Sequence, residues 1–164
     1  MVRHDPGYTW NGAGVPHKMR RVARVLGLDL GARRIGVAVT DELGLSAHPQ
    51  GTLERRGGQR DLDAIRDLVR AHAAGRVVIG LPLSPEGERG RAALAAERFA
   101  ERLRAVLDVP IELIDESFTT VEATSVLLEA DLSRKRRKEV VDKVAAALIL
   151  RRWLEAQRAG GTAA

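Results

Sequence analysis

The sequence predicts an α/β fold in which one sheet of mixed strand direction is flanked by helices. Short runs rich in Val and Ile alternate along the chain with segments whose apolar residues have helical spacing. The runs at Val22–Leu30 and Arg34–Thr40 are separated by a very short turn. Such a link makes the two strands antiparallel, because parallel neighbours need a long crossover. The chain has 164 residues, 45% of them hydrophobic, which is enough for one domain with a proper core.

The remaining elements follow in order along the chain. Further strands are predicted at His48–Leu53, at Arg76–Leu81 and, introduced by Pro110, at Ile111–Ile114. Helices are predicted around Leu62–Val69 and at Arg91–Leu107, Thr119–Glu129 and Lys138–Gln157. The order is therefore an antiparallel meander of three strands, followed by helices that alternate with two more strands.

The two ends of the chain lack a regular hydrophobic pattern. Residues 1–20 combine Gly, Pro and Asn without periodicity, so we expect a disordered leader there. The folded domain is then expected to span residues 21–157. Residues 158–164 end in AGGTAA and are expected to form a flexible tail.

Composition narrows the class of protein and its partners. The chain has no cysteine, which excludes disulfides and thiolate chemistry and agrees with a cytoplasmic location. It has no apolar run long enough for a membrane span and no secretory signal, so we expect no membrane partner. Aromatic residues make up only 3%, which argues against base stacking on an aromatic platform. The net charge of +5 favours nucleic acid as the partner, although a basic solvated surface is the plainer explanation.

Four carboxylates are candidates for a metal site. Asp29 lies at the end of the first strand, and Asp115 and Glu116 follow the end of the fifth. Sites in open α/β sheets gather at the carboxyl ends of strands, so these residues meet if their strands are neighbours. Asp142 lies in the last helix on an otherwise apolar face, where a carboxylate is costly unless it is paired or binds a metal.

Such a cluster suits a hard cation, Mg²⁺ or Mn²⁺, because the cation relieves the repulsion between carboxylates. Two such ions about 4 Å apart activate a water and stabilise the leaving oxygen of a phosphodiester. The same residues also have ordinary explanations. Asp29 is a normal turn former, Asp115 and Glu116 suit the start of a helix, and Asp142 can pair with Lys138 one turn earlier. From the residues alone these alternatives stay open.

Basic residues lie near the candidate acids in sequence. The densest cluster is Arg134-Lys135-Arg136-Arg137-Lys138, directly before Asp142, and Arg33-Arg34 form a second, smaller group. We expect these side chains to contact a nucleic-acid backbone, with salt-sensitive binding. The alternative for the larger cluster is an ordinary exposed helix start.

Four ordered motifs resemble those of the YqgF family, also called RuvX. They are GLDLGARRIGVAVTDELG (Gly27–Gly44), VIGLPLSPEGERG (Val78–Gly90), DESFTTVEA (Asp115–Ala123) and SRKRRKEVVDKVAAALIL (Ser133–Leu150). The family consists of bacterial proteins with a ribonuclease-H-like fold, similar to the Holliday-junction resolvase RuvC. The resemblance implies a five-stranded mixed sheet flanked by helices. It also implies a nuclease, a phosphodiester hydrolase, that processes the 5′ end of pre-16S rRNA in ribosome biogenesis.

The resemblance assigns roles residue by residue. Asp29, Glu116 and Asp142 match the family's catalytic, metal-binding acids. Asp115, directly before Glu116, is an additional candidate ligand from its position in the sequence. Lys138 matches a basic residue one turn before the last acid. A loop that lets backbone approach the substrate closely corresponds to Gly80, Leu81, Pro82, Gly87 and Gly90.

Two positions depart from the family pattern. Ser117 stands where the family has an Arg, and we expect Arg33, Arg34 or Arg89 to supply the lost phosphate contact. Ser84 and Glu86 stand where the loop usually has Asn and Asp. The acids themselves are intact, which predicts a hydrolase with bound Mg²⁺ or Mn²⁺.

Three functions remain open at this point. The first is a metal-dependent nuclease acting on structured RNA, and the second is a Holliday-junction resolvase acting on branched DNA as a symmetric dimer. The third is a non-catalytic RNA-binding or ribosome-assembly factor. The motif Asp-x-Gly also resembles the phosphate loop of actin-like ATPases, but the chain has no second copy and is too short. The sequence allows a monomer or a homodimer.

Overall fold

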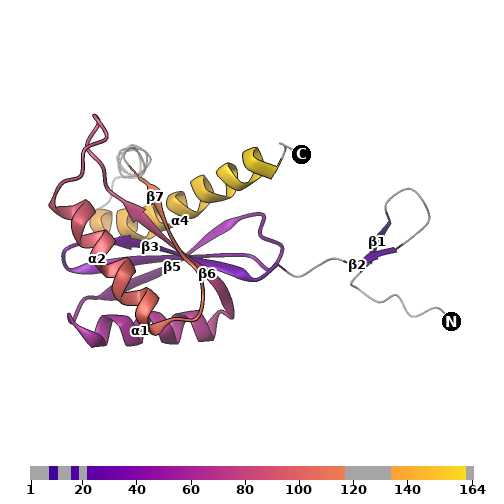
Figure 1. The fold of residues 1–164 in the computed structure, drawn as a ribbon, viewed down its shortest axis with the longest axis horizontal. Helices are drawn as coiled ribbons and strands as arrows, with labels where there is room; N and C mark the ends of the chain where they lie inside the picture. Colours follow the sequence, from indigo (N-terminus) through magenta and orange to yellow (C-terminus); the bar gives the residue numbers. More distant parts are fainter. Residues whose placement is uncertain (1–7, 11–15, 19–21, 117–133, 162–164) are drawn as a thin grey trace.

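A computed structural model of the protein shows a five-stranded sheet with helices on both faces (Figure 1). The structure describes residues 8–10, 16–18, 22–116 and 134–161. Side chains are described for residues 22–116, for residue 136 and for residues 144–160. The helix predicted at Thr119–Glu129 and the position of Ser117 lie outside the described residues.

The sheet has the strand order β5-β4-β3-β6-β7. These strands span Arg24–Leu30 (β3), Arg34–Thr40 (β4), Ala47–Glu54 (β5), Ala74–Leu81 (β6) and Ile111–Asp115 (β7). The strands β3, β4 and β5 pair antiparallel, while β6 is parallel to β3 and β7 is parallel to β6. The predicted mixed sheet, a meander followed by parallel strands, is confirmed.

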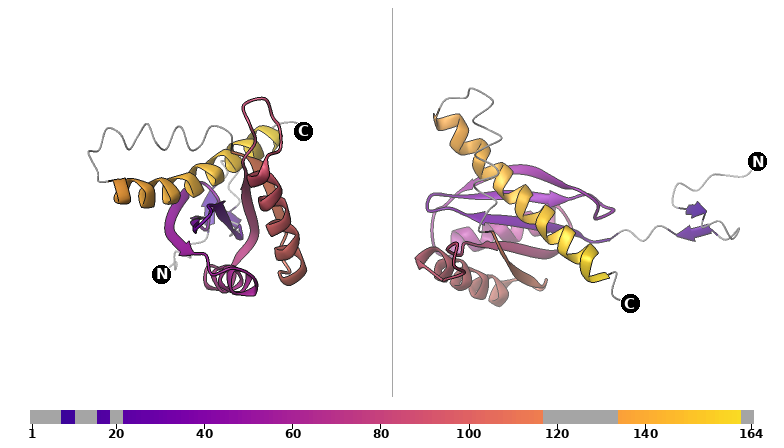
Figure 2. Two further views of the ribbon diagram at one scale, coloured as in Figure 1. Left: turned by 90° about the vertical axis from the view of Figure 1, so that its left-hand side faces the viewer. Right: turned by 90° about the horizontal axis from the view of Figure 1, so that it is seen from above.

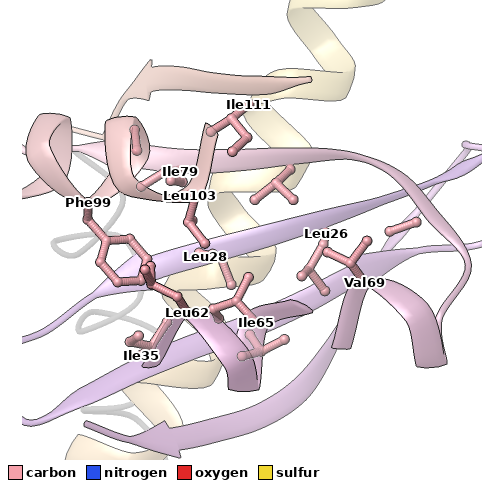
Figure 3. Packing of buried hydrophobic residues seen from close by; sticks show 14 of the residues in the cluster. Leu26, Leu28, Ile35, Leu62, Ile65, Val69, Ile79, Phe99, Leu103 and Ile111 are labelled. Atoms are coloured by element: carbon pink, nitrogen blue, oxygen red, sulfur yellow. The ribbon is translucent and has the colours of Figure 1, made fainter. Parts of the chain in front are cut away.

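Helices cover the two faces of the sheet and give each face its own core. Helices α1 (Gln59–Ala71) and α2 (Arg91–Val106) pack on one face, and α4 (Arg134–Gly161) crosses the other (Figure 2). The larger core, between the sheet and the first two helices, is shown in Figure 3 and includes Leu26, Leu28, Ile79, Phe99 and Leu103. The smaller core on the other side includes Val25, Val78, Ile149 and Leu150. This division follows from the alternation of side chains along each strand.

Glycine lets α4 lie close to the middle of the sheet. A Cβ atom on Gly27 would lie 2.4 Å from Cγ of Leu150, which is much closer than real contacts allow. The neighbouring strand repeats this arrangement at Gly80, which faces Ile149. Leu150 and Ile149 of α4 thus pack directly against the backbone of β3 and β6. A larger residue in place of either glycine would push the helix away from the sheet.

The last helix is longer than predicted. It begins at Arg134 and ends at Gly161, whereas the hydrophobic pattern indicated Lys138–Gln157. The first residues are Arg and Lys, which favour helix but carry no apolar period to mark it. At the other end, Nη2 of Arg158 donates a hydrogen bond to the carbonyl of Leu45, at 2.7 Å. Residues 158–161, which we expected to belong to a flexible tail, are thus the last residues of α4.

Two short strands lie in the predicted leader. Tyr8–Trp10 (β1) pairs antiparallel with Pro16–Lys18 (β2). These six residues lie within residues 1–20, where we expected a disordered leader, and strands of three residues leave no alternation in the sequence to detect. In the part of the chain that the structure describes, no helix is long and apolar enough to cross a membrane.

Candidate metal centre at the carboxyl ends of three strands

Parallel pairing brings the carboxyl ends of β3, β6 and β7 to one edge of the sheet. Asp29 is the penultimate residue of β3, and Asp115 is the last residue of β7. Between them lies β6, whose Leu81 pairs with Asp115. Glu116 follows at once and is tied to the same strand, because its N–H donates to the carbonyl of Leu81 at 3.1 Å. The predicted convergence of the first and fifth strand ends is thus a feature of the fold.

Gly80 makes the space in which the carboxyl group of Glu116 lies. A Cβ atom at Gly80 would lie 2.3 Å from Oε2 of Glu116 and 2.6 Å from Cδ1 of Ile149. Any residue larger than glycine at this position would therefore displace the side chain of Glu116 or of Ile149. We expected Gly80 to serve a substrate loop, but it lies inside β6, where its missing side chain accommodates the acid.

Glu116 is buried and shares a hydrogen bond with Asp29. Its relative exposure is 7%, and it is one of few buried polar residues among those described. Burial, followed by the negative charge of Asp29, a hydrogen bond to Asp29 and the charge of Asp115, raises the pKa of Glu116 to about 8. At neutral pH the buried carboxyl group therefore holds a proton and donates it to Asp29 in a hydrogen bond.

The other two predicted acids are Asp115 and Asp142, and the structure describes the side chain of Asp115 only. Asp115 is exposed and acts on Glu116 through its charge. Asp142 belongs to α4, but its side chain lies outside the described residues. Its position is two turns before Ile149, which places both residues on one face of the helix. Among the described side chains, no three acids or histidines lie together as a complete set of metal ligands.

The coupled pair nevertheless fits a divalent cation. Carboxylate oxygens are the donors that Mg²⁺ and Mn²⁺ prefer. Two acids that share a proton in a buried setting gain most from a cation that replaces the proton, since it removes both the repulsion and the cost of burying charge. Asp29 and Glu116 are the described residues that would hold the ion.

The predicted basic residues lie on several different elements of the fold. Arg33 is exposed in the turn after β3, and Arg34, the first residue of β4, is half-buried. Arg89 is exposed and forms an ion pair with Glu97, at 3.3 Å. Arg136 is exposed in the first turns of α4. The other four members of its cluster, Arg134, Lys135, Arg137 and Lys138, belong to the same turns, but their side chains lie outside the described residues.

The segment after β6 forms a small hairpin. Leu83 bridges to Arg89, and the Ser84 hydroxyl accepts a hydrogen bond from the N–H of Glu88 at 3.0 Å. Gly87 has a φ of 82°, a conformation that glycine adopts easily. Pro82 and Gly90 flank the hairpin, and Gly90 precedes α2 directly. Ser84, a departure from the family pattern, thus holds this hairpin closed.

Sequence reasoning missed the residues that shape the site from behind. Ile149 closes the space beside Glu116, yet in the sequence it is one apolar residue among many. Arg55 contacts the turn that follows Asp29, and nothing in its neighbourhood signals this. The only usable signal was Gly80, a glycine inside an otherwise continuous apolar strand, which indicates a close approach.

Comparisons with known proteins agree with this fold. The family model described as "RuvX: Holliday junction resolvase" matches residues 23–156. A protein of Myxococcus xanthus named "Putative pre-16S rRNA nuclease" is 49% identical over 135 residues, which cover 82% of this chain and 89% of that protein. A protein of Moorella thermoacetica with the same name is 46% identical over 132 residues, covering 80% and 94%.

A solved structure shares the fold at low sequence identity. The Fowlpox virus resolvase, solved with Holliday junction DNA, has a TM-score of 0.51 and 8% identity, and the match covers 82% of this chain and 98% of that one. This likeness supports the ribonuclease-H-like fold. The match of the family model over residues 23–156, together with the two relatives of 49% and 46% identity, shows that the chain belongs to the RuvX family.

Proposed function

We propose that this protein is a divalent-metal-dependent nuclease that hydrolyses phosphodiester bonds of structured RNA. The observation that carries the proposal is the buried carboxyl group of Glu116, which is hydrogen-bonded to half-buried Asp29 at the edge where three strands end. A buried acid whose pKa is raised by burial and by a second acid is costly for stability. Such groups are typical of functional sites.

Each residue of the site has a defined task in this proposal. Glu116 and Asp29 would hold the cation through their carboxylate oxygens, in place of the proton that they share. Asp142, a residue of α4, is proposed as the third ligand. When bound, Mg²⁺ or Mn²⁺, as two ions, supplies an activated water and stabilises the leaving oxygen. Gly80 and Ile149 keep the Glu116 carboxyl group in a fixed, largely dry position.

The substrate is proposed from the charge of the chain and from its relatives. Arg33, Arg34, Arg89 and the cluster at residues 134–138 offer cations to a phosphate backbone near the acids. The curated relatives are named for pre-16S rRNA. We therefore propose that the substrate is this RNA and that the cut contributes to maturation of its 5′ end.

Cleavage of branched DNA is the second candidate. It is favoured by the description of the family model, which names a Holliday junction resolvase. A resolvase makes two symmetric cuts and so acts as a dimer. Cleavage of four-way junctions by a dimer would therefore indicate a resolvase. Cleavage of RNA by a monomer would indicate an RNA nuclease.

The test compares the wild type with Asp29→Asn on pre-16S rRNA and on a four-way DNA junction, each with Mg²⁺ and with Mn²⁺. We expect the wild type to cleave the RNA and the variant to lose the activity. Asp67→Asn, which changes an exposed acid on α1, is the matched control and should cleave like the wild type. Cleavage of neither substrate by the wild type would contradict the proposal and favour a non-catalytic RNA-binding factor. Equal cleavage by Asp29→Asn would show that the site is wrong.

A further inference from the structure

Arg55 joins the turn that follows Asp29 to both helices on one face of the sheet. Its Nη1 donates a hydrogen bond to the carbonyl of Gly31 at 3.0 Å, and its backbone N–H donates to the carbonyl of Arg33 at 2.8 Å. Its guanidinium lies 5.8 Å from the ring centre of Phe99 on α2. One residue thus makes two hydrogen bonds to a turn that lies more than 20 residues earlier in the chain.

Asp61 on α1 fixes the orientation of Arg55. Its side chain is 4% exposed and lies 3.4 Å from Nε of Arg55. The other carboxylate oxygen of Asp61 accepts hydrogen bonds from the N–H groups of Arg56 and Gly57, at 2.8 and 3.1 Å. The backbone after β5 and the guanidinium of Arg55 are therefore held by the same buried carboxylate.

The turn that Arg55 contacts is tight and leads directly to the proposed site. The N–H of Gly31 donates to the carbonyl of Arg34 at 2.8 Å, and a Cβ atom on Gly31 would lie 2.7 Å from that carbonyl oxygen. Asp29 lies two residues before Gly31. A shift of this turn would move both Asp29 and the pair Arg33-Arg34.

We propose that Arg55 is a positioning residue that holds Asp29 in register with Glu116, an inference that rests on the proposed metal-dependent function. Its planar guanidinium contacts Asp61 through Nε and the Gly31 carbonyl through Nη1. A lysine ammonium has a single charged nitrogen on a flexible stem and does not reproduce this fork. Arg55 itself does not enter the chemistry, since it contacts the turn and not the two acids.

The alternative is that Arg55 only stabilises the fold and does not position Asp29, and the experiment must distinguish these two roles. Arg76 provides a matched control, because it is also paired with a carboxylate, Glu112, and lies 5.8 Å from the ring centre of Trp153. The two side chains are similarly exposed, 30% for Arg55 and 34% for Arg76. Arg76 lies at the start of β6, away from the edge that carries the acids. Its replacement should cost similar stability without affecting the site.

The first measurement is amide hydrogen exchange of residues 29–34 in the full chain, for Arg55→Met and Arg76→Met. We expect faster exchange at the Gly31 amide in Arg55→Met only, because its hydrogen bond closes the turn that Arg55 holds. Arg55→Lys should lie between that variant and the wild type. Wild-type exchange at Gly31 in Arg55→Met would overturn the inference, whatever the protein's activity.

The second measurement is the response to Mn²⁺, read as the rise in Tm with metal concentration and as kcat and KM for RNA cleavage. In Arg55→Met we expect the Mn²⁺ concentration for half-maximal stabilisation to rise and kcat to fall by about 10- to 100-fold, the scale of a small misplacement of a reacting group. KM should change little, and Arg76→Met should keep both metal response and kcat. An unchanged metal response in Arg55→Met would overturn the inference. A wild type that Mn²⁺ does not stabilise would contradict the proposed function instead, and exchange at Gly31 would then still decide whether Arg55 holds the turn.

Discussion

Glu116 is the residue on which the proposed site most depends. Its carboxyl group combines burial with a neighbouring acid, and both effects favour the protonated form. The sequence indicated that Glu116 follows a strand, but not that Gly80 on the next strand leaves room for it. The sequence pattern shows which residues lie at the end of a strand. Whether a residue on the neighbouring strand leaves room for them depends on contacts that form only in the folded chain.

The first prediction concerns pH and stability without metal. The pKa of Glu116 rises from about 4.5 when unfolded to about 8 when folded. Its contribution to stability is therefore complete below about pH 4.5 and is lost as the pH rises through 8. The Tm of the wild type relative to Glu116→Gln should fall by several degrees between pH 5 and 9, since 1 kcal/mol is worth about 2–4 °C in a domain of this size. A constant difference between the two proteins would contradict the assignment.

The second prediction concerns Gly80. A methyl group there overlaps Glu116 and Ile149, so Gly80→Ala should destabilise the fold by about 1–3 kcal/mol and abolish the stabilisation by Mn²⁺. Gly27→Ala is the matched control, because the three atoms nearest to its methyl group all belong to Leu150 of the same helix and none to an acid. That variant should lose comparable stability, measured by urea unfolding, and keep its metal response. Loss of the response in both variants would show that α4 packing alone explains the effect.

At the scale of elements, the strands were predicted better than the helix ends. The tight turn between Leu30 and Arg34 fixed the antiparallel pair, and β4 lies at its predicted residues, Arg34–Thr40. The start of α4 could not be found, because its Arg and Lys residues have no hydrophobic period. The cluster at residues 134–138 thus belongs to the helix that carries Asp142.

The third prediction concerns this basic start of α4. Cations at a helix N-terminus are unfavourable and are tolerated more easily with an anionic ligand. Charge reversal of Arg136 and Arg137 to Glu should weaken RNA binding and flatten its dependence on salt, measured by titration at several salt concentrations. The same reversal at Arg151 and Arg152, later in α4, is the control. Unchanged binding in the first variant, or equal loss in both, would contradict a specific role for the cluster.

For the whole molecule, the sequence predicted the class of fold and the edge of the sheet that carries the acids. Asp29 and Glu116 are confirmed as neighbours, whereas the role of Asp142 stays a prediction because its side chain lies outside the described residues. The contacts of Arg55 were not predictable, since they join residues far apart in the sequence through side-chain geometry. Local patterns indicate elements, but long-range polar contacts depend on the completed fold.

The fourth prediction concerns the extent of the working domain. The family model matches residues 23–156, and the β1–β2 pair lies outside that range. A shortened chain of residues 22–161 should therefore unfold at the same temperature as the full chain and cleave RNA at the same rate. A lower Tm or a slower cut would show that the first residues contribute to the domain.

The central claim is that Asp29 and Glu116 bind a divalent cation in exchange for their shared proton. Calorimetric titration with Mn²⁺ at pH 7, in two buffers of different ionisation enthalpy, measures the binding and the protons released together. Because the pKa of Glu116 is about 8, the wild type should release close to one proton per site at pH 7 and fewer at pH 9. Asp29→Asn and Glu116→Gln should bind weakly or not at all. Binding without proton release, or undiminished binding by both variants, would contradict the account.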